Sequence, residues 1–125
     1  MDANAEFIVN IVDDDCGSRE SVAALANSLK FATRLFASAQ DFLASYGGER
    51  GCVITDVRMP ELSGLDLLKA LNDLDWGIPV IVVSGFAETS VVVEAMQRGA
   101  VTFLEKPYSE NDLWNVLRAA VQHDD

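Results

Sequence analysis

Short runs of apolar residues alternate along the chain with segments whose apolar residues recur at helical spacing. The runs predict five strands, over residues 7–12, 33–36, 52–55, 80–83 and 101–104. The periodic segments predict five helices, over residues 19–29, 38–46, 65–71, 89–98 and from 109 onward. The run at 80–83 is apolar at every position, which is typical of a parallel strand covered on both faces. This alternation predicts one open α/β sheet in three layers with right-handed crossovers.

Polar residues mark where two of these helices begin. Ser38 is followed three positions later by Asp41, and Ser109 stands in the same relation to Asp112. A hydroxyl side chain before a helix can accept a hydrogen bond from a backbone N–H of the first turn, which has no partner within the helix. We therefore expect N-caps at Ser38 and Ser109.

Composition and charge narrow the choice of function. The 125 residues are 50% hydrophobic, which is enough for one domain with its own core and leaves little room for a second. Twenty acidic residues against nine basic ones give a net charge of −11, spread evenly over the two halves of the chain. Nonspecific binding to nucleic acid or to an anionic membrane is therefore disfavoured, because both need clustered Lys and Arg.

The sequence shows no sign of membrane insertion or export. Its longest apolar runs are four to five residues, far short of the span of about 20 that a transmembrane helix needs. The first residues are acidic, whereas a signal peptide begins with positive charge. Cys16 and Cys52 form no CxxC pattern, and a domain with this core does not need a disulfide. We expect a cytoplasmic protein.

Candidate chemistry lies at the carboxyl ends of the predicted strands, where open parallel sheets bind their ligands. The residues at these ends are Asp13, Asp14 and Asp15 after the first strand, Asp56 after the third, Ser84 after the fourth and Lys106 after the fifth. If the first and third strands are neighbours, their carboxylates converge, and oxygen ligands without His or Cys suit Mg²⁺ or Mn²⁺. Lys106 and Ser84 would then offer a cation and a hydroxyl donor to a phosphoryl group. Each acid taken singly is more often a solvated turn or a helix cap, so the prediction depends on their joint placement.

Residues 56–64 read DVRMPELSG and fit the pattern D-x-x-M-P-x-x-x-G. Further matches are the acidic pair at 13–14 and the dipeptides Ser84-Gly85, Gly99-Ala100 and Lys106-Pro107. In this order they resemble the receiver domains of two-component response regulators, over essentially the whole chain, and those of the FixJ type in particular. The resemblance implies a flavodoxin-like (βα)5 fold, a doubly wound parallel sheet of five strands in the order 2-1-3-4-5. It also implies a single receiver domain over residues 1–125 with no output domain, either standing alone or excised from a transcriptional regulator.

The same resemblance assigns roles to single residues. Asp56 would accept a phosphoryl group from a sensor histidine kinase or phosphotransfer protein, and Lys106 would pair with that group. Mg²⁺ would be bound by the carboxylates of Asp14 and Asp56, with Asp13 assisting, and by the backbone carbonyl of Arg58. Ser84 would hydrogen-bond to the new phosphate, and the Phe103 ring would move into the space that Ser84 leaves. Such a domain is no enzyme beyond its own phosphorylation and dephosphorylation, and its Lys106-Pro107 bond is commonly cis.

The helix predicted at 89–98 suggests an additional surface. Its inward stripe is predicted to be Val92, Ala95, Met96 and Gly99, which leaves Val91 and Val93 facing outward. Single exposed valines are ordinary. In receiver domains, however, phosphorylation-driven dimers form on the face made by the fourth helix, fifth strand and fifth helix. We therefore hypothesise a weak homodimer through Val91 and Val93.

Three other protein classes compete with this interpretation. A magnesium-dependent phosphatase of the haloacid-dehalogenase type would use Asp13-x-Asp15, but Cys16-Gly17 follows where that motif expects Thr or Val, and the chain leaves no room for a cap. A receiver-like docking module that takes no phosphate would have no need of the acids and lysine present here. A flavodoxin-like electron carrier would need a phosphate loop rich in Ser, Thr and Gly after the first strand, where this chain has three acids.

Overall fold

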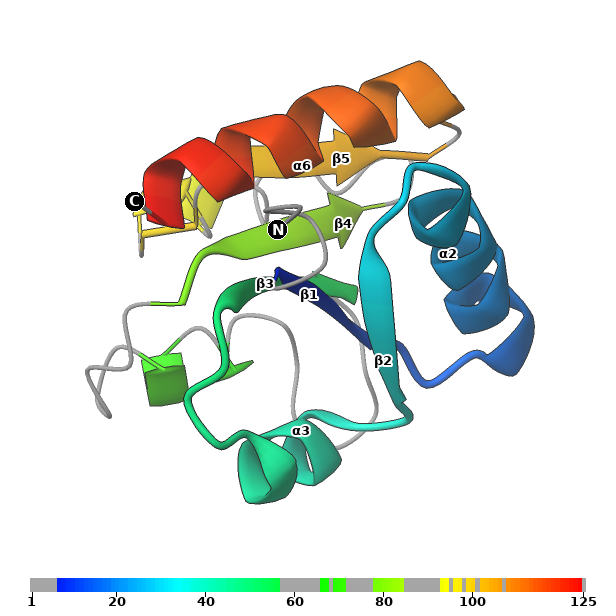
Figure 1. Ribbon diagram of the computed structural model, residues 1–125. Helices are drawn as coiled ribbons and strands as arrows, with labels where there is room; N and C mark the ends of the chain where they lie inside the picture. The colour runs from blue at the N-terminus through cyan, green and yellow to red at the C-terminus, as the bar shows by residue number, and fades with distance from the viewer. Residues whose placement is uncertain are drawn as a thin grey trace.

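The computed structural model describes residues 7–56, 66–67, 69–71, 78–84, 93–94, 96–97, 99–100, 102–106 and 108–124. Five parallel strands form one sheet in the order β2-β1-β3-β4-β5 (Figure 1). They are β1 (Ile8–Val12), β2 (Ala32–Phe36), β3 (Gly51–Asp56), β4 (Val80–Ser84) and β5 (Thr102–Glu105). The helices are α2 (Cys16–Ser28), α3 (Ala39–Ser45) and α6 (Glu110–Asp124). The five predicted strands, the parallel sheet and the implied strand order are confirmed.

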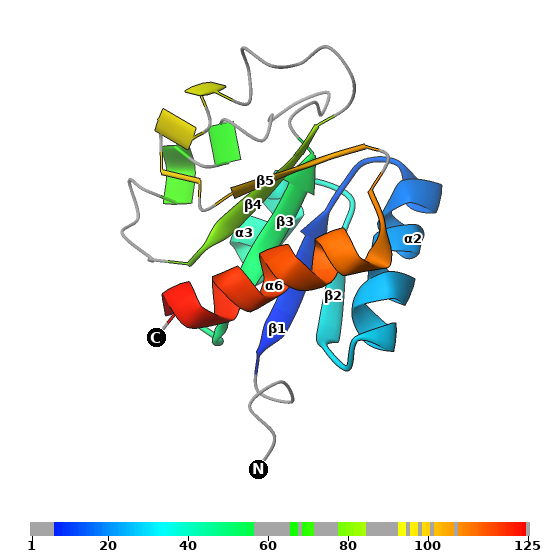
Figure 2. The same ribbon diagram turned by 90° about the horizontal axis from the view of Figure 1, so that it is seen from above.

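Two hydrophobic clusters cover the two faces of the sheet. One joins β1, β3 and β4 to α2 and α6, and it includes Phe7, Ile54 and Leu117. The other lies on the opposite face, where Phe42 of α3 packs with Leu67 and strand residues. Figures 1 and 2 show α6 and α3 on opposite sides of the strands. The central strands are therefore buried on both faces, as the uniformly apolar runs predicted.

Residues Val80 to Val83 show this arrangement within a single strand. All four are buried, with Ile81 and Val83 in the first cluster and Val80 and Val82 in the second. Side chains of a strand alternate between its two faces, so a strand with apolar residues at every position contributes to both clusters. β4 is therefore an inner strand of the sheet.

Both predicted N-caps are present. Ser38 Oγ accepts from the Asp41 amide at 3.1 Å. At the start of α6, Ser109 Oγ accepts from the Asp112 amide at 3.1 Å, and Asp112 Oδ2 accepts from the Ser109 amide at 3.0 Å. This reciprocal pair satisfies donors that a helix start leaves without partners.

Helix α2 begins at Cys16, three residues before the predicted start. Its N-cap is Asp15, whose Oδ2 accepts from the Ser18 amide at 2.7 Å. The apolar spacing used for the prediction begins only at Val22, so the polar first turn left no periodic signal. One member of the acidic triplet thus serves as a helix cap.

The two remaining predicted helices are described only in part. Residues 66, 67, 69–71, 93, 94, 96 and 97 are helical. The inward stripe predicted for the first of these helices is Leu65, Leu68 and Leu71, of which only Leu71 is among the described residues and is buried. Leu67, which is not in that stripe, is buried as well. The prediction that Met96 and Gly99 face inward is wrong, because the Met96 side chain is 38% exposed and Gly99 is also exposed. Met96 follows Val93 by three positions and therefore shares the outward face of that helix. Val91, Val92 and Ala95 lie outside the described residues.

Close packing of β1 against β3 requires a glycine. Gly51 is paired with Ile8, and a Cβ atom at position 51 would collide with the Ile8 carbonyl oxygen.

Cys16 is exposed and Cys52 is buried, and both are free thiols. In the described part of the chain, no helix is long and apolar enough to cross a membrane.

Candidate functional site

The parallel register brings the predicted site residues to one edge of the sheet. Val12 of β1 is paired with Thr55 of β3, so that Asp13 follows β1 at the level of Asp56. Asp56 is in turn paired with Val83 of β4, and the next residue of β4, Ser84, is paired with Glu105 of β5. Neighbouring strands lie about 4.8 Å apart. Residues that are distant in sequence therefore meet at the carboxyl edge of these strands.

Lys106 and Asp56 form an ion pair at this edge. Lys106 Nζ lies 3.5 Å from Asp56 Oδ2, although the two residues are 50 positions apart and β4 lies between their strands. The side chain of Lys106 is 39% exposed and that of Asp56 is 19% exposed. At 3.5 Å the contact is at the limit for a hydrogen bond, so the attraction between the two charges dominates. A carboxylate oxygen and an ammonium group thus face a common space.

The three acids after β1 have three different environments. Asp13 is buried, with 6% of its surface exposed, and its Oδ1 accepts from the Asp15 amide at 2.9 Å. Asp14 is exposed. Asp15 caps α2 through Oδ2. Of the triplet, Asp13 and Asp14 therefore remain as candidate metal ligands.

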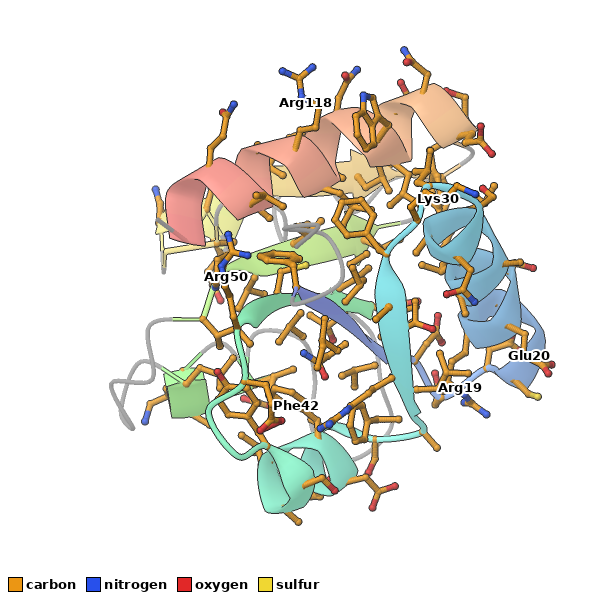
Figure 3. The ribbon with its side chains drawn as sticks, viewed as in Figure 1. Arg19, Glu20, Lys30, Phe42, Arg50 and Arg118 are labelled. Carbon is orange, nitrogen blue, oxygen red and sulfur yellow. The ribbon has the colours of Figure 1, made fainter. Side chains whose placement is uncertain are left out.

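Arg19 is a neighbour of the site that sequence reasoning missed. Its Nη1 donates to the backbone carbonyl of Asp13 at 2.7 Å, from one turn into α2. Figure 3 shows Arg19 near the start of α2, beside Glu20. The sequence offers no clear signal for this contact, because it depends on how sharply the chain turns between β1 and α2. An arginine in a helix is otherwise a common surface residue.

Tyr108 is a second residue that the sequence did not point to. Its partly buried side chain packs against the core cluster shared by α2 and α6. Burial, and to a smaller extent the negative charge of Asp13, raises the pKa of the Tyr108 hydroxyl above its ordinary value of 10.0. The hydroxyl is therefore protonated at neutral pH, close enough to the acidic loop to be affected by its charge.

The site offers carboxylate oxygens, which are the ligands that a hard divalent cation prefers. Among the described residues, no three His, Cys, Asp or Glu side chains are grouped to hold a metal ion. Mg²⁺ does not need such a group, because it keeps several waters and takes only one or two carboxylates. Asp13 and Asp56 offer oxygen ligands from neighbouring strand ends, next to the exposed Asp14. This donor set suits Mg²⁺ or Mn²⁺ and does not suit zinc.

Several predicted site residues lie partly or wholly outside the part of the chain that the structure describes. Arg58, Val91 and Pro107 are not among the described residues, and of Ser84 only the backbone is described, at the end of β4. The structure places two others on the surface, since Phe103 of β5 is 43% exposed and Val93 is 50% exposed. The outward position predicted for Val93 is confirmed.

Comparison with known proteins identifies one family along most of the chain. The family model described as the response regulator receiver domain matches residues 9–118 of the sequence. The chain is 40% identical to the response regulator protein TmoT of Ectopseudomonas mendocina over 118 residues, covering 94% of this chain and 54% of TmoT. It is also 40% identical to the transcriptional regulatory protein FixJ of Rhizobium meliloti over 119 residues, covering 94% of this chain and 58% of FixJ. The chain thus spans just over half the length of these curated relatives.

Solved structures agree with the sequence comparison. A crystal structure of FixJ-N superposes with a TM-score of 0.89 at 40% identity, covering 94% of each chain. Full-length FixJ from B. japonicum superposes with a TM-score of 0.88 at 34% identity, covering 97% of this chain and 60% of that one. These similarities do not favour the phosphatase or the docking module that carries no phosphate.

Proposed function

Because this chain belongs to the response regulator receiver domain family, we propose that Asp56 accepts a phosphoryl group from the phosphohistidine of a sensor histidine kinase or phosphotransfer protein. The observation that carries the proposal is the approach of Lys106 Nζ to Asp56 Oδ2, at 3.5 Å. A lysine paired with the acceptor can hold a phosphoryl oxygen by charge without blocking the second carboxylate oxygen. Receiver domains act as signalling switches and are not conventional enzymes.

The transfer is a single displacement at phosphorus. One oxygen of the Asp56 carboxylate attacks, an O–P bond forms, the P–N bond to the donor imidazole breaks, and the imidazole leaves with its electron pair. The product is an acyl phosphate on Asp56. Phosphoryl transfer needs little covalent work from the protein, so alignment and charge neutralisation provide the catalysis. Lys106 contributes the positive charge from this chain.

The residues that would hold Mg²⁺ are the carboxylates of Asp13, Asp14 and Asp56 and the backbone carbonyl of Arg58, with Mn²⁺ as a substitute. When bound, the ion supplies positive charge to the phosphoryl oxygens. The protein's own part is to keep acidic side chains together despite their repulsion. The burial of Asp13 and its hydrogen bond to the Asp15 amide support this role.

Ser84 and Phe103 would convert phosphorylation into a change of surface. The Ser84 hydroxyl would turn toward the phosphate, and the Phe103 ring would enter the space it leaves. The exposure of Phe103 supports this, because a ring that is 43% exposed gains from burial. Fully burying an exposed side chain of this size contributes about 1.5–3 kcal/mol, so burying the part of Phe103 that is still exposed contributes about 1 kcal/mol toward the bias of a two-state switch. A phenylalanine has no hydroxyl, so the inward state depends on packing alone.

The exposed apolar residues Val93 and Met96 are the described part of the proposed dimer face. Phe103 is exposed as well, but it would leave the surface on phosphorylation. Val91 is the further member proposed from the sequence. Phosphorylation would shift the monomer–dimer equilibrium by repositioning Phe103. Sedimentation as a monomer at high protein concentration, with and without beryllofluoride, would contradict this part of the proposal.

The relatives' names suggest the wider setting. FixJ and TdiR are named transcriptional regulatory proteins, and on that basis we propose that this receiver controls transcription through an output partner or domain. A receiver of this kind would act in the cytoplasm and would remove its own phosphoryl group. This domain itself would bind neither DNA nor a membrane, since its net charge is −11.

The test is intact-mass spectrometry after incubation with acetyl phosphate. The wild-type chain should gain one phosphoryl group in the presence of Mg²⁺ and much less after chelation with EDTA. Asp56→Asn should gain none. Asp41→Asn is the matched control, because Asp41 is an exposed acid on α3. Equal labelling of Asp56→Asn and wild type would refute the proposed acceptor.

A further inference from the structure

We infer that Arg19 is a positioning residue that sets the Mg²⁺ affinity of the acidic loop after β1, an inference that rests on the proposed function. The loop comprises Asp13, Asp14 and Asp15. The guanidinium of Arg19 donates to the Asp13 backbone carbonyl at 2.7 Å, in a partly buried position. The contact is to the backbone, so Arg19 leaves the carboxylates of the loop available to a cation.

Hydrogen bonds hold this loop from both sides. On the strand side, the Asp13 amide donates to the Phe36 carbonyl of β2 at 3.1 Å. On the helix side, Asp15 accepts from the Ser18 amide at 2.7 Å through Oδ2. Arg19 connects the two sides, because it belongs to α2 and bonds to the first residue after β1. The hydrogen bond from Arg19 thereby fixes the peptide group between Asp13 and Asp14, which orients both side chains.

A guanidinium suits this task better than a neutral donor. Hydrogen bonds from a charged donor are shorter and stronger than neutral ones, and 2.7 Å is at the short end of their range. Removing the donor would leave a partly buried carbonyl without this partner, and the peptide would rotate to find another. Such a rotation redirects the carboxylate of Asp13, which is buried and cannot follow the cation freely.

Two possible roles of Arg19 make opposite predictions for Mg²⁺ binding. If its positive charge acted mainly at a distance, it would repel the cation, and removing the charge would tighten binding. If its hydrogen bond positions the loop, removing it weakens binding. Losing an outer-shell partner of a metal ligand typically weakens metal binding by about 10-fold or more. The sign of the change therefore separates positioning from electrostatics.

The experiment is calorimetric titration of the full chain with MgCl₂, well below the melting temperature of each variant. Arg19→Gln should raise the Mg²⁺ dissociation constant by about 10-fold. Arg19→Lys, which keeps a charged donor, should lie between Arg19→Gln and wild type. Arg118→Gln is the control for net charge, because Arg118 lies over the Trp114 ring of α6, away from α2's start (Figure 3), and it should bind like wild type.

A dissociation constant for Arg19→Gln equal to or below that of wild type would overturn the inference. If Arg19→Gln does not fold, Arg19→Met decides, because it removes both the charge and the donor while keeping an unbranched side chain. Mg²⁺ binding by Arg19→Met as tight as that of wild type would then overturn the inference. If acetyl phosphate did not phosphorylate the wild-type chain, the proposed function would be refuted. The inference about Arg19 would still be tested, because calorimetry measures Mg²⁺ binding without phosphorylation.

Discussion

Replacing Lys30 with glycine should stabilise this domain. Lys30 has a φ of 76°, in the left-handed region, and it is the one non-glycine residue of the described chain with positive φ. It directly follows Leu29, the C-cap of α2. A side chain with a Cβ atom is strained in this conformation, whereas glycine adopts it without penalty.

The hydrogen bonds explain why Lys30 keeps this conformation. The Lys30 amide donates to the Asn27 carbonyl at 3.0 Å, and the Phe31 amide donates to the Ala26 carbonyl at 3.1 Å. These two bonds are the Schellman arrangement that closes a helix. Phe31 is also buried, and the centroid of its ring lies 6.0 Å from the centroid of the Phe7 ring. The helix end and the core thus hold the backbone at position 30 in place.

The expected gain follows from two opposing terms. Left-handed backbone costs a residue with a Cβ atom about 1–2 kcal/mol. Glycine loses more conformational entropy on folding, which costs roughly 0.5–1 kcal/mol. Lys30→Gly should therefore gain about 0.5–1 kcal/mol. For a chain of 125 residues, this raises the melting temperature by about 2–4 °C.

Thermal denaturation followed by circular dichroism measures the effect. Lys30→Ala is the control, because it removes the same charge but keeps the strained Cβ, so the glycine variant should melt above the alanine variant. Gly48→Ala tests the reverse change, since Gly48 has a φ of 91° and a Cβ there would meet nothing within 4 Å. It should lower stability by about 1 kcal/mol through backbone strain alone. A Lys30→Gly variant that melts below Lys30→Ala would refute the reasoning.

Three further predictions concern the metal, the sheet register and the exposed thiol. Mg²⁺ at ten times its dissociation constant should stabilise the fold by about 1.4 kcal/mol, and an unchanged melting temperature in millimolar MgCl₂ would contradict the metal site. Gly51→Ala should cost about 2 kcal/mol or more in urea unfolding, because the new methyl group meets the Ile8 carbonyl, and a wild-type midpoint would contradict the close pairing of β1 and β3. The hydrogen bond from Cys16 Sγ to Glu20, at 3.2 Å, raises the pKa of the Cys16 thiol, so Glu20→Gln should speed its alkylation by iodoacetamide at neutral pH. Buried Cys52 is the internal control, and an unchanged Cys16 rate would show that Glu20 does not protect the thiol.

Some features of the site depended on contacts that no local pattern encodes. Arg19 reaches back to the Asp13 carbonyl because of how the chain turns between β1 and α2, and no period or motif points to that contact. The cap that Asp15 forms on α2 is local, but the sequence alone did not separate it from a solvated turn or a metal ligand. Met96 was misassigned for a related reason. Its position in an apolar stripe does not say which side of the helix meets the sheet.

Short patterns in the amino-acid sequence are enough to specify the strands, the helix starts and the polar residues at the strand ends. Wholly apolar runs specify inner strands, and Ser109 with Asp112 specifies a helix start, because both signals act over a few residues. The ion pair between Lys106 and Asp56, which are 50 residues apart and separated by β4, forms only when the sheet is assembled. That contact follows from strand order and register, which come from packing two apolar faces of one sheet between helices. Packing is a property of the whole chain, so no short segment contains it.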